Sequence, residues 1–175
     1  MKEHDLKKLL QDKQIIEQKI KKYQNQKILT TTQNKNLQEI QGHLEKSEHN
    51  QRFTATIKNT EFKDWAISGC YYACYHAALA LILQKKYFSK NHLATLCVLI
   101  KEYYKKELDK EDIELLSQLL DYEDLKTYVE TKNKREQATY STKTKYEKED
   151  LETIRVKTAL FVSKAKTIIE RNDHF

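Results

Sequence analysis

The stretch from Trp65 to Leu83 contains no acidic residue, lysine or arginine, although a third of the whole chain is charged. These 19 residues are nearly as many as a helix needs to cross a bilayer, which is about 20. A membrane span would place Tyr71, Tyr72 and His76 near the bilayer centre, where polar groups need internal partners. We therefore interpret the stretch as the buried central helix of a protein that does not enter the membrane.

The rest of the composition predicts an all-α fold. The chain has 175 residues, no proline and only two glycines, so it lacks the residues that β-hairpins and tight turns require. Apolar residues recur at spacings of three and four along most of the sequence. We expect an up-and-down bundle of five or six helices and no sheet.

The predicted helices follow from this periodicity and from capping residues. They are a first helix ending near Thr30, a second from near Asn36 to Asn59, the central helix from about Asp64 to Lys86, a helix opened by Ser89, a helix capped by Asp109 that ends near Thr139, and a final helix from about Lys148 to Arg171.

We divide the chain into an amphipathic helix with a linker, residues 1–35, and a helical bundle, residues 36–175. The apolar stripe of the first segment is narrow and includes Leu6, Leu9, Ile16 and Ile20. Such a stripe either packs across the bundle or pairs with a second copy in a short coiled coil.

Charge and cysteine content limit the class of protein. The net charge of +6 permits nucleic-acid binding without indicating it, because basic and acidic residues alternate along the chain. The three cysteines, Cys70, Cys74 and Cys97, lie in apolar helical sequence, and their odd number is unlike a disulfide scaffold. Cys70 and Cys74 lack the spacing of a zinc site. We predict a cytoplasmic protein with no metal and no cofactor.

Three motifs in the same order resemble the HEPN superfamily. The first is the aromatic and small-residue helix Asp64–Ile82, DWAISGCYYACYHAALALI. The second is the KNH sequence of residues 90–92, and the third is the REQATY sequence of residues 135–140, which has the form Arg-x-x-Ala-x-Tyr. The resemblance covers roughly residues 37 to 170.

This resemblance implies a four- or five-helix bundle that forms a homodimer and binds RNA or a nucleotide. HEPN proteins include ribonuclease toxins and partners of minimal nucleotidyltransferases in toxin–antitoxin operons. The ligand-binding residues would be Arg135, which can grip a phosphate, Tyr140, which can stack on a base, and the nearby Lys134 and Lys143.

The chain departs from the family at the ribonuclease motif. Active HEPN ribonucleases carry an arginine, four to six further residues and then a histidine, and none of the four arginines here is followed in this way. Tyr140 stands at the spacing of that histidine, and a tyrosine, with a pKa of about 10, is a poor base near neutral pH. We therefore expect Arg135 and Tyr140 to bind a ligand rather than cut it.

Two alternatives stay open. A metal-independent ribonuclease toxin would need another histidine, and the candidates are His76 and His92. Their structural interpretations are a buried His76 bonded to a neighbouring tyrosine hydroxyl and a solvated His92 in the first turn of its helix. The other alternative is a partner or modification target of a nucleotidyltransferase, with Tyr140 or Tyr146 as the acceptor hydroxyl.

Overall fold

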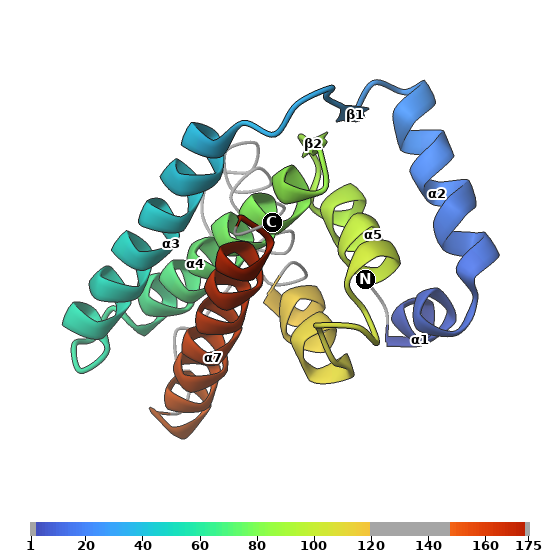
Figure 1. The fold of residues 1–175 in the computed structure, drawn as a ribbon. Coiled ribbons are helices and arrows are strands. Elements are labelled where there is room, and N and C mark those ends of the chain that lie inside the picture. Colours follow the sequence, from blue (N-terminus) through green and yellow to red (C-terminus); the bar gives the residue numbers. More distant parts are fainter. Residues whose placement is uncertain (1–2, 120–147, 174–175) are drawn as a thin grey trace, which may run out of the picture.

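The computed structural model describes residues 3–119 and 148–173, and this part of the chain is almost entirely helical (Figure 1). The helices and strands are α1 (Glu3–Gln11), α2 (Lys13–Asn25), β1 (Leu29–Thr31), α3 (Leu37–Ile57), α4 (Lys63–Gln84), β2 (Tyr87–Ser89), α5 (His92–Glu102), a helix of residues 110–119 and α7 (Lys148–Asp173). The predicted all-α fold is confirmed.

The uncharged central helix is α4, and it lies in the middle of the bundle. It contacts α3, α7, α5 and β2, and the side chains of Ala73, Cys74, Ala77 and Ala80 are all inaccessible to solvent. α4 is the one helix of the described part that is long and apolar enough to cross a membrane, but 83% of its apolar window is buried inside the protein. Core helices of globular proteins are also long, apolar and buried. This agrees with the interpretation of the segment as a buried central helix.

The N-terminal segment forms two helices, so the prediction of a single helix was wrong. The break lies at Asp12, whose extended backbone ends α1 and whose Oδ1 accepts hydrogen bonds from the Gln14 and Ile15 amides at 2.8 and 3.3 Å. This is N-cap geometry, which the aspartate stabilises by satisfying two amides at the start of α2. Ile16 and Ile20 are buried, and α2 lies against α5. The division of the chain at residue 35 stays a prediction.

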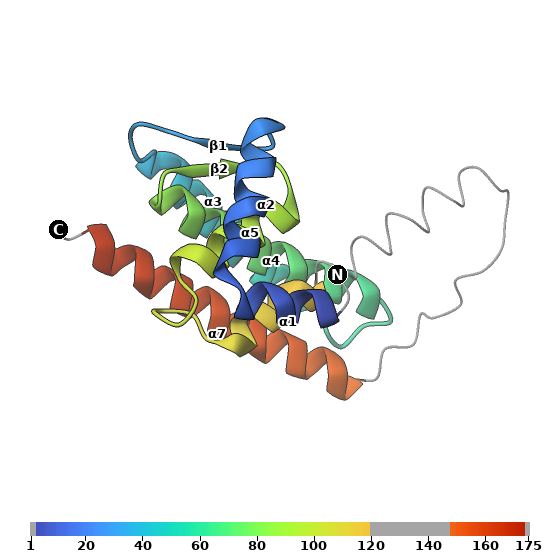
Figure 2. The same cartoon turned by 90° about the vertical axis from the view of Figure 1, so that its right-hand side faces the viewer.

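A short antiparallel sheet contradicts the prediction that no sheet is present. β1 pairs with β2 in the register Leu29↔Ser89, Thr30↔Phe88 and Thr31↔Tyr87, at one end of the bundle (Figure 2). The scarcity of glycine and proline argued only against hairpins, and these strands are instead joined through α3 and α4. Lys27 and Lys86 supply the left-handed backbone of the turns, with φ of 56° and 63°.

Helix caps decide two further boundaries. Ser89 was predicted to open the next helix but lies in β2, and the N-cap of α5 is Asn91, whose Oδ1 accepts a hydrogen bond from the Ala94 amide at 3.0 Å. Asp109 caps the 110–119 helix as predicted. Its Oδ1 accepts from the Asp112 amide, and Asp112 Oδ2 accepts from the Asp109 amide, so the two residues form a reciprocal capping box.

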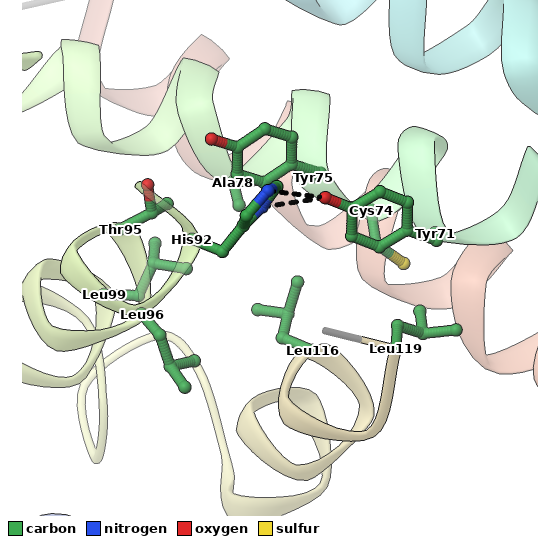
Figure 3. A pocket seen from close by; sticks show the side chains of 10 residues that line it. All are labelled: Tyr71, Cys74, Tyr75, Ala78, His92, Thr95, Leu96, Leu99, Leu116 and Leu119. Atoms are coloured by element: carbon green, nitrogen blue, oxygen red, sulfur yellow. Dashed lines mark hydrogen bonds between the residues drawn. The ribbon is translucent and has the colours of Figure 1, made fainter. Parts of the chain in front are cut away.

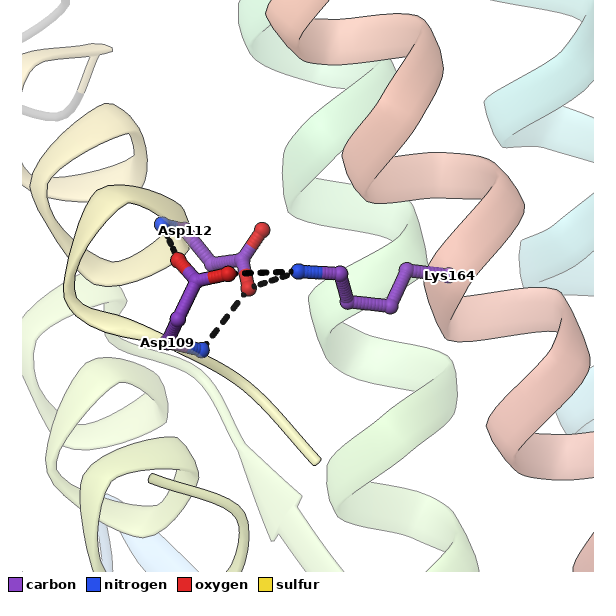
Figure 4. A network of polar contacts seen from close by, with 3 residues as sticks. All are labelled: Asp109, Asp112 and Lys164. Carbon is purple, nitrogen blue, oxygen red and sulfur yellow. Dashed lines mark hydrogen bonds and ion pairs between the residues drawn. The ribbon is translucent and has the colours of Figure 1, made fainter. Parts of the chain in front are cut away.

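A lysine of α7 forms ion pairs with both aspartates of this capping box (Figure 4). Lys164 Nζ lies 2.6 Å from Asp112 Oδ2 and 2.9 Å from Asp109 Oδ2. The hydrogen bond from Lys164 lowers the pKa of the Asp109 carboxyl. We call these three residues the lysine clamp, because they join α7 to the start of the 110–119 helix.

Candidate functional site

The predicted ligand-binding residues Arg135, Tyr140, Lys134 and Lys143 lie outside the described part of the chain. The two candidate histidines lie within it, on α4 and at the first position of α5. Each contacts a side chain of another helix. The sequence alone could not identify these partners.

His92 bonds to a tyrosine of α4 (Figure 3). The Tyr71 hydroxyl lies 2.7 Å from His92 Nδ1 and 3.1 Å from its Nε2, and Tyr71 is only 2% exposed. The Tyr75 ring also lies against the imidazole, with centroids 4.3 Å apart. The expected solvated position of His92 is therefore wrong, because Tyr71 and Tyr75 hold its ring against the bundle.

A small cavity opens beside this histidine, between α4, α5 and the 110–119 helix (Figure 3). Its volume is about 10 Å³, which is near the minimum for one water molecule. Its lining is mostly apolar, with Leu96, Leu99 and Leu116 opposite the two tyrosines. Burial raises the pKa of the Tyr75 hydroxyl, so this group stays neutral near pH 7. The cavity is too small for a nucleotide.

His76 meets a histidine of α3 that the sequence analysis did not single out. The Nδ1 atoms of His43 and His76 lie 2.9 Å apart, and the two rings stack with centroids 5.1 Å apart. One imidazole must be the N–H donor and the other the acceptor, so the contact requires at least one neutral ring. The expected tyrosine partner of His76 is thus replaced by His43, which no spacing along the chain would reveal.

Burial keeps this histidine pair uncharged near neutral pH. Desolvation, together with the nearby His43 and Lys46, lowers the pKa of His76 to about 4. Desolvation also lowers the pKa of His43, with Glu39 opposing the shift and Lys46 adding to it. Both imidazoles can accept a proton only at an energetic cost while the protein is folded.

We expect the histidine pair to make the protein less stable in mild acid. The folded pKa of His76 lies below the unfolded value of about 6.5, so the unfolded state binds more protons and stability falls as pH drops from about 6.5 to 4. Because the ring is partly exposed, we discount the shift and expect a loss of about 1–2 kcal/mol. Urea unfolding of wild type and His76→Gln between these pH values measures it. The variant should show a flatter profile, whereas His49→Gln, which changes an exposed histidine of α3, should follow wild type.

Histidine and tyrosine rings thus form a continuous series across three helices. It runs from His43 on α3 through His76 and Tyr75 on α4 to His92 on α5, with successive centroids 5.1, 6.3 and 4.3 Å apart. The residues around His92 and its cavity include no arginine. Within the described ranges, no group of three or more histidine, cysteine or acidic side chains is arranged to hold a metal ion.

Comparison with curated proteins finds a similar chain in an archaeon. It is the protein named "Putative toxin MJ0142" of Methanocaldococcus jannaschii, which is 29% identical over 136 residues. The match covers 77% of this chain and 84% of that protein. No family model matches the chain.

Proposed function

We propose that this protein is a toxin-like protein of the HEPN type that binds RNA or a nucleotide. The observation that carries the proposal is the similarity to "Putative toxin MJ0142", which extends over 77% of this chain. The helical bundle around α4 agrees with the architecture that the HEPN resemblance implies. The proposal includes a cytoplasmic homodimer that acts in a toxin–antitoxin or defence system and needs no cofactor.

The ligand would be held by the Arg-x-x-Ala-x-Tyr motif of residues 135–140. The guanidinium of Arg135 can donate two parallel hydrogen bonds to a phosphate, and the Tyr140 ring can stack on a base. Lys134 and Lys143 add positive charge along the same stretch of sequence. This assignment comes from the motif, since these residues lie outside the described ranges.

The described histidines favour binding over cleavage. General acid–base catalysis works best with a group whose pKa lies near the working pH. The pKa of His76 is about 4 and its Nδ1 is engaged by His43. His92 is bonded to Tyr71 beside a cavity that holds no more than about one water molecule. These contacts support a binding role over a role for either histidine as the general base of a ribonuclease.

Replacing Arg135 with alanine should weaken RNA binding at least about tenfold, because hydrogen bonds to charged groups contribute about 1.5–3 kcal/mol. The salt dependence should also become shallower by about 0.7 in slope, the value for one lost phosphate contact on a single strand. Fluorescence anisotropy with a labelled single-stranded RNA at several salt concentrations measures both effects. Arg171→Ala, which removes an exposed arginine from the end of α7, is the matched control.

Two outcomes would contradict this proposal. Wild-type protein that binds neither RNA nor nucleotides would remove its basis. RNA cleavage in EDTA that Arg135→Ala abolishes would replace binding with the metal-independent ribonuclease. Induced expression in bacterial cells tests the toxin-like role separately, since wild type should arrest growth and Arg135→Ala should not.

A further inference from the structure

A second place in the molecule can bind an anion, and it is formed entirely by described residues. α3 and α7 lie side by side against α4 (Figure 1), and a groove of about 240 Å³ opens along their seam. Two arginines from different helices line it, Arg52 of α3 and Arg155 of α7. We propose that this groove is a binding site for the phosphoryl groups of a phosphate or diphosphate ligand.

The two guanidinium groups have donors to spare. Arg155 uses Nε and Nη2 to grip Glu152, and this bidentate contact leaves three of its five N–H bonds for another acceptor. Arg52 is exposed, and no residue of the described ranges forms an ion pair with its guanidinium. Glu152 thereby orients the Arg155 side chain while its remaining donors stay available at the groove.

The charge around the groove is positive. Arg52 and Arg155 are the charged side chains among the described residues that line the groove, and both are positive. Arg155 is paired with Glu152, which also lies 4.0 Å from Lys58. Further along the same seam, Lys166 and Glu48 cancel each other at 2.9 Å. A doubly charged anion would balance this excess better than a carboxylate, which carries a single charge.

The residues that line the groove between the two arginines are neutral. Burial raises the pKa of the Cys70 thiol, although hydrogen bonds with Thr158 and Thr54 and the charge of Arg155 oppose the shift, so the thiol carries no charge that would repel an anion. Ala55 and Ala159 leave room between the arginines. Pockets that enclose a drug-sized ligand usually measure about 300–1,000 Å³, so this groove fits phosphoryl groups with the rest of a larger ligand outside it.

This site is distinct in sequence from the Arg135 motif and does not depend on the proposed function. The sequence gives no reason to pair Arg52 with Arg155, because neither is followed by the histidine of the ribonuclease motif and they are about a hundred residues apart in the chain. Only the packing of α7 beside α3 brings them to one groove.

Titration calorimetry with inorganic pyrophosphate tests the site. Wild-type protein should bind pyrophosphate saturably, with an affinity that falls as salt rises. Arg52→Ala and Arg155→Ala should each weaken binding about tenfold or more, as expected for the loss of charge-assisted hydrogen bonds. Arg52→Lys should retain part of the affinity because it keeps the charge, and acetate should not compete. Arg171→Ala, which removes an exposed arginine at the end of α7, should bind pyrophosphate as wild type does.

Absence of saturable binding to wild type at about 10 mM pyrophosphate would overturn the proposal. Unchanged affinity in folded Arg52→Ala would overturn it as well. Because Arg52 is exposed, this variant keeps the test informative if Arg155→Ala unfolds. Loss of pyrophosphate binding in Arg135→Ala but not in Arg52→Ala would transfer the anion site to the motif of the proposed function.

Discussion

Replacing Gly69 with alanine should destabilise the protein by about 2 kcal/mol, even though alanine is the better helix former by about 1 kcal/mol. α3 and α4 approach so closely at this glycine that a Cβ would overlap Thr54 Oγ1 and lie 3.1 Å from Phe53 Cδ1. Thr54 is 1% exposed, and its hydroxyl donates to the Asn50 carbonyl at 3.0 Å. The side chain cannot turn away without breaking this bond or forcing the two helices apart. Urea unfolding measures the loss.

The other glycine provides the control. A Cβ at Gly42, on the exposed face of α3, would meet nothing within 4 Å. Gly42→Ala should therefore stabilise the protein by about 0.5–1 kcal/mol, opposite in sign to Gly69→Ala. The double variant Gly69→Ala with Thr54→Ala should recover part of the loss, because the overlapping hydroxyl is gone. A Gly69→Ala protein as stable as wild type would mean that α3 and α4 are not in such close contact.

Removing the ammonium of the lysine clamp should cost about 2 kcal/mol, because it leaves a nearly buried carboxylate without its cation. The side chain of Asp112 is 10% exposed, and Lys164 Nζ lies 2.6 Å from it. Burial alone would lower the pKa of Lys164, but its bonds to Asp112 and Asp109 raise the pKa overall, so the cation is held in place. Lys164→Met keeps an unbranched apolar side chain and removes the ammonium group with its hydrogen bonds, and urea unfolding measures the difference.

A second lysine of α7 is the matched control for the clamp. Lys166 pairs with Glu48 at the surface, where the two side chains are 49% and 40% exposed. Such pairs contribute about 0–1 kcal/mol, so Lys166→Met should have little effect on the free energy of unfolding.

The contribution of the lysine clamp should depend on pH. Because Lys164 lowers the pKa of Asp109, the stability that this bond supplies is present above the unfolded pKa of about 4 and is lost below it. The gap between wild type and Lys164→Met should narrow in acid, and equal losses in the two variants at neutral pH would refute the burial argument.

The features that the sequence predicted well depend on local patterns. The central helix was expected at about 64–86 and forms at Lys63–Gln84, because a segment without charges can only be buried between neighbours. The capping role of Asp109 was also predicted, since a cap involves residues three apart in the chain. Asp12, an equally good cap, went unnoticed because the apolar stripe continues on both sides of it.

The features that the sequence did not predict depend on packing between distant segments. β1 and β2 are separated in the chain by two long helices. Each strand is too short to show the alternation of apolar and polar residues that would predict it from the sequence. His43 and His76 meet only because α3 packs against α4. Arg52 and Arg155 share a groove only because α7 packs beside α3. The motif around Arg135 was found from the resemblance alone, and its geometry lies outside the described residues.

The small sheet gives the N-terminal segment, residues 3–31, a second structural role. Through β1, the segment that follows α2 supplies the only strand of the described ranges that pairs with β2. A shortened chain that starts after Thr31 would lose β1 and with it the Ile28 carbonyl, which accepts a hydrogen bond from the Lys90 amide at 3.1 Å. The edge of β2 would then be uncovered, and exposed strand edges are surfaces through which separate chains pair and aggregate. We therefore expect β1 to keep this strand edge from pairing with another chain, in addition to the packing of α2 against α5.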